Sequence, residues 1–321
     1  MTEQKKCFVG IDTSNYTTSV AVCDTDGIVI ANLKAPLFVK SGECGLRQSD
    51  AVFAHTKNLP DLMSKLSLVL DGYEPVAVCV SATPRMVEGS YMPCFLSGVA
   101  AAYSFSASAK IPIFKTAHQN GHVMAALYSS GEAEKLLKKR FLAFHVSGGT
   151  TEALLVSPSN DENVFTVELV GETDDINAGQ AIDRVGVMLG IDFPAGKELE
   201  ILANRYSGAI EKKKITVKDC RCNLSGIENI AKNLYANGAS KEKVAAFTFD
   251  FIQRTLCEMA SQVLQKYGDM PILFAGGVMS NKIMRKALCK QFEAYFAEPE
   301  FSADNAAGVA LLCREKYNWF K

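Results

Sequence analysis

The sequence lacks any run of apolar residues long enough to cross a membrane as a helix. It also lacks an excess of either charge, because 34 Lys and Arg residues nearly balance 35 Asp and Glu residues and the net charge is −1. The chain as a whole therefore lacks the net positive charge that is typical of nucleic-acid-binding proteins, and any RNA contact has to come from a local basic patch. The first residues lack the apolar core and cleavage site of a signal peptide. We expect a cytoplasmic protein that does not associate with membranes.

No low-complexity segment and no linker interrupts the 321 residues, and 48% of them are hydrophobic, which is enough for a sizeable core. The ten cysteines lie mostly in apolar surroundings. Without an export signal we interpret them as reduced thiols.

A weak internal repeat organises the chain. Residues 7–24 and 140–158 both contain a β-rich run, a turn of small and hydroxyl residues, and a second β-rich run. A further strand follows each, then helices and a single strand, at residues 77–82 in the first half and 271–278 in the second. Apolar residues at helical spacing predict helices over 50–70, 181–190 and 240–268. The pattern predicts an α/β fold of two duplicated lobes with a cleft between them.

Two histidines stand four residues apart in the segment AHQNGHVMAAL. On a helix, His118 and His122 share one face, so both imidazoles could reach one metal ion. The spacing alone equally allows an accidental pair with one buried ring and one exposed ring.

Three loops carry residues suited to a phosphoryl ligand, because hydroxyl and backbone N–H groups bind anions and glycine permits close approach. We predict nucleotide binding by the first hairpin turn, by the second hairpin turn and by the segment FAGGVMSN, where a strand meets a helix. An acidic segment, residues 171–184, could hold Mg²⁺ or a ribose, or could form a solvated turn and helix cap. The predicted residues are Ser14, Thr17, Thr18, Ser147, Gly148, Gly149, Thr150, Asp175, Gly179, Asp183, Gly276, Gly277 and Asn281.

These segments together resemble the actin, sugar kinase and Hsp70 superfamily, and within it the tRNA N6-adenosine threonylcarbamoyltransferases, formerly called O-sialoglycoprotein endopeptidases. The blocks GIDTSNYTTSVAV, AVFAHTKNLP, AHQNGHVMA, VSGGTTEALLV, GETDDINAGQAIDR, NLSGIENI, AGGVMSN and SADNAAGVA occur in the family's order. The resemblance implies an actin-like duplicated fold. We expect lobe I to comprise residues 1–115 with 305–321, and lobe II residues 116–304.

The resemblance implies a metal site. In the family, the two helix histidines and an aspartate near the C-terminus bind iron or zinc, and those positions here are His118, His122 and Asp304. Two imidazoles and a carboxylate suit Fe(II) or Zn(II) with positions left open for substrate. His145 directly precedes the second turn, where some members place a tyrosine that faces the metal. We predict His145 as a further ligand, the alternative being a histidine packed in the core.

The sequence departs from the family in the segment before the histidines. Residues 81–98 lack the family's first glycines, are longer, and carry Arg85 and Glu88. Later in the chain, GQAIDR (residues 179–184) and FPAGKE (residues 193–198) replace the family's GEAFDK and YPGGP. The chain is therefore interpreted as a divergent paralogue whose acceptor is the least predictable feature.

The resemblance implies a transferase that moves a threonylcarbamoyl group from its adenylate to N6 of an adenosine in tRNA, with one divalent metal and an adenine nucleotide as cofactors. Alternatives are carbamoyl transfer to a different acceptor, or a nucleotide-binding regulatory or scaffold paralogue without turnover. Protease activity is not expected, because Gln119 follows His118 where zinc proteases need a glutamate base. The implied partners are tRNA, a smaller paralogous subunit and an ATPase, and a homodimer is also open. Two basic segments could contact RNA: Lys138, Lys139 and Arg140, and Lys212, Lys213 and Lys214.

Overall fold

The computed structural model describes residues 4–14, 16–38, 46–298, 301 and 306–320. The chain forms two compact units, which are described separately. The first comprises residues 1–137, 158–167 and 300–321, and the second comprises residues 138–157 and 168–299. Among the described residues, no helix combines the length and apolar character needed to cross a membrane.

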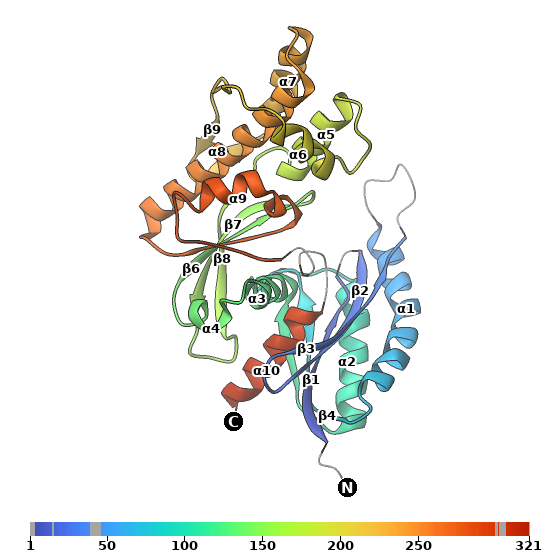
Figure 1. Cartoon of the computed structure of the whole chain (residues 1–321). Helices are drawn as coiled ribbons and strands as arrows, with labels where there is room; N and C mark the ends of the chain where they lie inside the picture. The colour runs from blue at the N-terminus through green and yellow to red at the C-terminus, as the bar shows by residue number, and fades with distance from the viewer. Residues whose placement is uncertain (1–3, 15, 39–45, 299–300, 302–305, 321) are drawn as a thin grey trace. The chain divides into compact units, whose positions relative to one another are not determined.

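The first unit is built on a five-stranded sheet in the order β3-β2-β1-β4-β5 (Figure 1). β1 pairs antiparallel with β2, which pairs antiparallel with β3, whereas β1, β4 and β5 run parallel. The strands are Lys5–Asp12, Thr17–Asp24, Val29–Pro36, Tyr73–Thr83 and Ile113–Ala117.

The second unit repeats this arrangement in a sheet whose strand order, read from the corresponding edge, is β8-β7-β6-β11-β12. β6 pairs antiparallel with β7, and β6, β11 and β12 run parallel. The strands are Phe141–Val146, Thr151–Pro158, Phe165–Glu172, Ile272–Ala275 and Ala294–Phe296 for β6, β7, β8, β11 and β12. A separate small hairpin contains β9 (Thr216–Lys218) and β10 (Arg221–Asn223). The shared strand order confirms the duplicated α/β fold predicted from the repeat.

Helices follow the strands in both units. In the first unit they are α1 (Gln48–Val69), α2 (Phe95–Ala109), α3 (His118–Ser130), α4 (Ala133–Leu136) and α10 (Ala307–Phe320). In the second they are α5 (Ala178–Met188), α6 (Gly196–Asn204), α7 (Gly226–Ala236), α8 (Lys241–Tyr267), the 3₁₀ helix η1 (Gly277–Ser280) and α9 (Lys282–Leu288). The helices expected over 50–70, 181–190 and 240–268 are thus present.

Side chains along β1 point alternately to the two faces of the sheet, so neighbouring residues pack against different helices. Val9 and Ile11 pack in a core cluster with residues of α1 and α2. Gly10 faces the other way, against α10, where a Cβ atom would collide with the backbone of Ala306 and Ala310. Because strand side chains alternate, Asp12 shares the face of Gly10. The last residue of β1 therefore lies on the side of the sheet that α10 occupies.

α3 belongs to the first unit, although we expected residues 116–137 in the second lobe. α3 and α10 cross at two glycines that permit close approach: a Cβ on Gly308 would collide with the carbonyl of Gly121, and a Cβ on Gly121 would lie 3.1 Å from Val309. This crossing binds α3 to the first sheet, which explains the later boundary after Leu137.

Candidate metal centre and nucleotide-binding loops

His118 and His122 converge on one point beside α3. Their Nε2 atoms lie 2.9 Å apart, and their ring centroids lie 4.3 Å apart at an interplanar angle of 74°. His118 is the first residue of α3, which begins directly after the buried end of β5, Thr116 and Ala117. The structure therefore brings together the two histidines that the spacing singled out.

Asp12 fixes the orientation of His118. The His118 Nδ1 atom lies 2.9 Å from Oδ2 of Asp12, whose side chain is 1% exposed. The carboxylate also accepts hydrogen bonds from the backbone N–H and hydroxyl of Ser14 and from the hydroxyl of Ser81. Burial alone would raise the pKa of Asp12. The charge of His118 and the hydrogen bonds outweigh burial and hold that pKa below its ordinary value.

An ionised Asp12 determines which nitrogen of His118 carries the proton. In the neutral form of His118, Nδ1–H donates to this carboxylate, and the lone pair of Nε2 then faces Nε2 of His122. Hydrogen bonding of the second ring nitrogen to a carboxylate is the usual support for a metal-binding histidine. Sequence reasoning missed Asp12. Its signal was one acidic residue at the end of the otherwise apolar strand FVGID.

The donor pair fits a divalent metal ion such as iron or zinc. With metal–nitrogen bonds of about 2.1 Å, two nitrogens on one ion lie about 3.0 Å apart at an angle of about 90° and about 3.4 Å apart at the tetrahedral angle. The observed distance between the two Nε2 atoms, 2.9 Å, is just below this range. The predicted third ligand, Asp304, lies outside the described residues. Within the described part of the chain, no three His, Cys, Asp or Glu side chains cluster as a metal site. His145 lies in the second unit, on β6 opposite Glu152 of β7, and its role as a ligand stays a prediction.

The hydroxyls of the first hairpin turn are engaged within the first unit. Ser14 bonds to Asp12, and Thr18 is buried and lies 2.9 Å from Nδ1 of His55. Thr17 is half-buried at the start of β2. These hydroxyls brace the end of the sheet beside the histidine pair, and their contact with a nucleotide stays a prediction.

His55 is a second residue that sequence reasoning did not single out. Asn58 Nδ2 donates to Thr18 Oγ1, and the Thr18 hydroxyl shares a hydrogen bond of 2.9 Å with Nδ1 of His55. Burial lowers the pKa of His55 to about 4, against an opposing effect of Asp12. Its buried Nε2 has no hydrogen-bond partner among the described residues. His55 is therefore neutral at physiological pH.

In the second unit, the β6–β7 turn forms a loop with accessible backbone. Ser147 Oγ accepts hydrogen bonds from the N–H groups of Gly149 and Thr150, at 3.2 and 3.0 Å. Gly148 and Gly149 are exposed, with no atoms near the position of an added Cβ. The N-terminus of α5 packs against this loop: Gly179 N–H donates to the Ser147 carbonyl, and a Cβ on Gly179 would lie 2.7 Å from Gly148.

The loop after β11 lies beside the β6–β7 turn. Gly276 has φ 98°, and its α-carbon adjoins the backbone of Val146, so only glycine fits there. Gly277 is exposed. Asn281 is 5% exposed and caps α9 by accepting from Met284 N–H at 2.9 Å, while its Nδ2 donor has no partner among the described residues. The sequence-predicted glycines of three loops thus gather in one region of the second unit.

The two predicted acidic residues, Asp175 and Asp183, both accept hydrogen bonds from backbone N–H groups. Asp175 accepts from the hydroxyl and N–H of Ser225 and from the N–H of Leu224. Although burial acts to raise it, these hydrogen bonds lower the pKa of Asp175 to about 2. Asp183 accepts from Ala195 N–H at 2.8 Å. Whether either carboxylate contacts Mg²⁺ or a ribose stays a prediction.

The segment that departs from the resembled family touches the histidine helix. The Pro84 carbonyl accepts a hydrogen bond from Gln119 N–H at the first turn of α3, and the Arg85 carbonyl accepts from the Thr83 hydroxyl. The next residues expose Val87 and Tyr91, at 60% and 61%. The segment in which this sequence departs from the family therefore lies beside the candidate metal centre.

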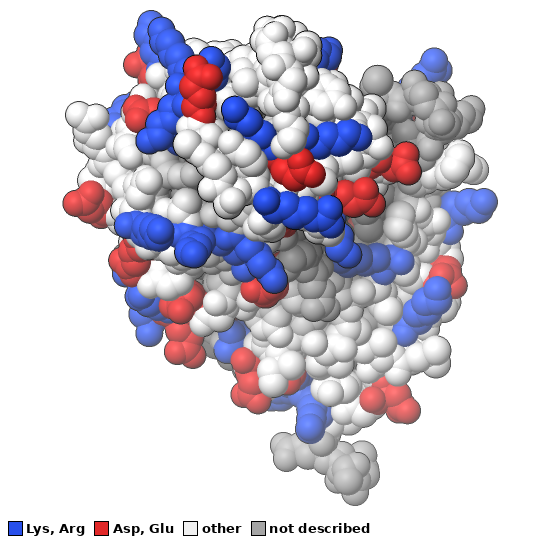
Figure 2. All heavy atoms as spheres, turned by 45° about the horizontal axis from the view of Figure 1, so that its top comes forward, with Lys and Arg blue, Asp and Glu red and all other residues white. Residues whose placement is uncertain are grey.

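The basic segments are partly neutralised. Lys139 lies 3.9 Å from Glu293, and Lys213 pairs with Glu211. Figure 2 shows Lys and Arg side chains interspersed with Asp and Glu side chains on the face that it presents. The distribution agrees with a net charge near zero and leaves RNA contact by these segments a prediction.

Comparison with known proteins identifies relatives of the whole chain. The family model described as tRNA N6-adenosine threonylcarbamoyltransferase matches residues 48–311. Proteins with that name from Streptococcus suis and Streptococcus sanguinis are each 27% identical, covering 98% and 97% of this chain and 93% and 92% of their own.

Solved structures are similar at the level of the fold. HypF from T. kodakarensis has a TM-score of 0.63 at 13% identity, over 99% of this chain and 48% of its own. A ROK hexokinase from Thermus thermophilus has a TM-score of 0.55 at 13% identity, over 97% of this chain and 99% of its own. The sugar kinase likeness agrees with the duplicated actin-like fold.

Proposed function

The chain belongs to the tRNA N6-adenosine threonylcarbamoyltransferase family and is a transferase, and on that premise we propose that it transfers a threonylcarbamoyl group to adenosine in tRNA at a metal-dependent site. The observation that carries the proposal is the convergence of His118 and His122 at 2.9 Å, with His118 oriented by the buried Asp12. Asp12 makes one hydrogen bond to the His118 imidazole and accepts three more from Ser14 and Ser81. A buried, oriented carboxylate of this kind is the usual support of a metal-binding histidine.

The metal would be held by His118 and His122, with Asp304 as the proposed third ligand. When bound, a divalent ion of this kind supplies charge that polarises a carbonyl and stabilises developing negative charge. Asp12 keeps Nε2 of His118 available for it. Ser14 and Ser81 in turn hold Asp12 in place.

The adenylate would be bound by the loops of the second unit. The backbone N–H of the exposed Gly148 suits its phosphate, and the unpaired amide donor of Asn281 suits its adenosine. In the proposed reaction, the N6 amine forms a bond to the carbamoyl carbon. The bond from that carbon to the phosphate oxygen breaks, AMP leaves with the electron pair, and N6 loses a proton. The donor is already activated, so positioning supplies much of the rate and no nucleophilic side chain is needed.

We propose that a smaller paralogous subunit binds the first unit. Phe53 on α1 is 72% exposed, and Leu96 and Tyr103 on α2 are 51% and 47% exposed. α1 and α2 are joined near these positions by the contact between the hydroxyls of Thr56 and Ser97, at 3.1 Å. Exposed apolar side chains on adjacent helices are typical of protein interfaces. A second copy of this chain and an ATPase are further proposed partners.

A transfer assay tests the function. Metal-loaded protein is mixed with threonylcarbamoyl-adenylate and unmodified tRNA, with and without candidate partner subunits, and the digested nucleosides are measured by mass spectrometry. We expect threonylcarbamoyladenosine above the no-enzyme blank. Its absence with protein that binds both metal and nucleotide would refute the proposal.

One observation favours a second candidate, transfer to a different acceptor. The segment containing Arg85 and Glu88 adjoins the start of α3, where it could alter the space available to an acceptor. The same assay with free nucleosides and amines in place of tRNA distinguishes the two candidates by the product formed.

A further inference from the structure

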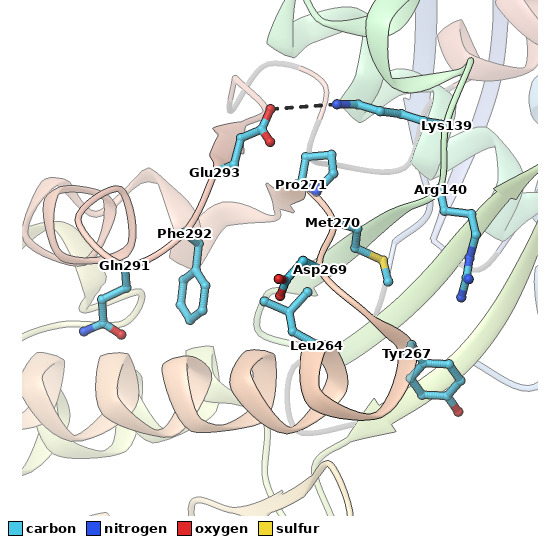
Figure 3. A pocket seen from close by; sticks show the side chains of 10 residues that line it. All are labelled: Lys139, Arg140, Leu264, Tyr267, Asp269, Met270, Pro271, Gln291, Phe292 and Glu293. Atoms are coloured by element: carbon cyan, nitrogen blue, oxygen red, sulfur yellow. Dashed lines mark ion pairs between the residues drawn. The ribbon is translucent and has the colours of Figure 1, made fainter.

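A hollow of about 600 Å³ lies in the second unit, away from the loops described above (Figure 3). It lies where Arg140 precedes β6, Pro271 precedes β11 and Glu293 precedes β12. These three strands run parallel, so the hollow lies at their amino ends. The turn at Ser147 follows the carboxyl end of β6. Six strand residues at about 3.3 Å each place the two regions about 20 Å apart.

Apolar and aromatic side chains form half of the lining of the hollow. Figure 3 shows Leu264 and Met270 in the middle, with Tyr267 on one side and Phe292 on the other. The volume lies within the range of small-molecule sites, roughly 300–1,000 Å³. Aromatic side chains on both sides of such a hollow suit a flat, unpaired base, because every base offers a face for stacking.

Cations lie on one side of the hollow. Arg140 is exposed and, among the described residues, has no ion pair or hydrogen-bonded partner. Figure 3 shows its side chain on the same side as Tyr267. Lys139 contacts Glu293 only at 3.9 Å, and Lys266 Nζ lies 5.0 Å from the centre of the Tyr267 ring. An unpaired guanidinium beside aromatic rings suits a phosphate that is attached to a base.

Acidic groups narrow the class of ligand. Asp269 and Glu293 also line the hollow. Two carboxylates repel a ligand with dense negative charge, such as a free nucleoside triphosphate. They accept hydrogen bonds from the amino groups of bases. A nucleotide within a chain, with one phosphate charge per base, satisfies both sets of groups.

We propose that this hollow binds an unpaired nucleotide of the RNA substrate, as a second contact at the end of β6 opposite to the nucleotide-binding loops of the second unit. The phosphate lies against Arg140 and Lys139, and the base lies over Leu264 between Tyr267 and Phe292. The inference rests on the proposed function for the identity of the RNA. It adds a site that holds the acceptor RNA without touching the reacting atoms.

The test compares Arg140→Glu with Arg205→Glu, which makes the same charge change at the exposed end of α6 in the same unit. Binding of a fluorescent single-stranded RNA of about ten nucleotides and of unmodified tRNA is measured across a salt series. We expect Arg140→Glu to weaken binding of the single-stranded RNA about tenfold and to reduce the salt dependence. The Arg205→Glu protein should bind like the parent. Equal losses in the two variants would overturn the site.

Crosslinking gives a readout that is independent of catalysis. RNA carrying 4-thiouridine is irradiated with the parent protein, and we expect crosslinked peptides containing Tyr267 or Phe292. Crosslinks that map only elsewhere would overturn the site, as would displacement of the RNA by an equal concentration of AMP, which would assign the hollow to a free nucleotide. If transfer fails but the variants differ and the crosslink maps to this hollow, the proposed function fails and the binding site stands. If transfer succeeds but no crosslink maps to this hollow, the proposed function stands and the binding site fails.

Discussion

The carboxylate of Asp12, at the end of β1, accepts a hydrogen bond from Nδ1 of His118, the first residue of α3, over 2.9 Å. The two residues are 106 positions apart in the sequence, and the contact connects the first strand of the fold to the helix that carries both candidate ligands. It leaves Nε2 of His118 directed at Nε2 of His122.

Removal of one imidazole should empty the metal centre. We expect His118→Ala to lower metal content, measured by plasma mass spectrometry after anaerobic purification, well below that of the parent. His145→Ala should lower it less if His145 is a peripheral ligand. Equal metal content in the parent and His118→Ala proteins would remove His118 from the site.

Weakening the support of His118 should lower metal affinity without removing a ligand. Asp12→Asn replaces an ionised acceptor by a neutral amide whose NH₂ group cannot accept from Ser14 or Ser81. We expect metal affinity, measured by competition with a chelator, to fall about 10–100-fold. Ser81→Ala, which removes one of the hydrogen bonds to Asp12, serves as the milder control. An Asp12→Asn protein with the affinity of the parent would show that the carboxylate only supports the fold.

The buried His55 should make stability depend on pH. Its folded pKa of about 4 lies below its ordinary value of 6.5, so the unfolded chain binds more protons between these values. The free energy of unfolding should therefore fall as pH drops from 6.5 toward 4, by about 3 kcal/mol in total. Urea unfolding of the parent and of His55→Leu at pH 7.5 and pH 5 measures this, because only the parent carries the His55 contribution. Equal pH dependence in the two proteins would disprove it.

Close packing at the N-terminus of α5 should be needed for nucleotide binding. A Cβ on Gly179 would lie 2.7 Å from Gly148, so Gly179→Ala should displace the β6–β7 turn. We expect at least about a tenfold loss of affinity for a fluorescent adenine nucleotide, consistent with the loss of one or two backbone hydrogen bonds. Gly226→Ala has open space around the added methyl group and should bind as the parent does. Unchanged binding by Gly179→Ala would separate this turn from the nucleotide site.

Much of the fold could be predicted because its signals are local. β-rich runs on both sides of hydroxyl-rich turns predict both hairpins, and the repeat of that pattern predicts the duplication. The histidine pair was also local, since four residues on a helix fix which side chains share a face. These features need no knowledge of tertiary structure.

The supporting residues could not be predicted, because they depend on contacts between distant segments. Ser81 bonds to Asp12 across 69 residues, and a single serine in a strand gives no spacing signal. The assignment of α3 to the first unit depends on its crossing with α10 at Gly121 and Gly308, which only the packed helices reveal. The hollow beside Arg140 likewise combines residues from three strand starts and the end of α8.

The most direct test of the account is metal-dependent transfer in a single turnover. Protein stripped of metal, and the same protein reloaded with Fe(II) or Zn(II), are each mixed with threonylcarbamoyl-adenylate and unmodified tRNA, and His122→Ala is treated identically. The account predicts threonylcarbamoyladenosine from the reloaded parent, little from the stripped parent, and little from His122→Ala under either condition. Equal product from the stripped and reloaded parent would contradict the role assigned to the His118–His122 pair.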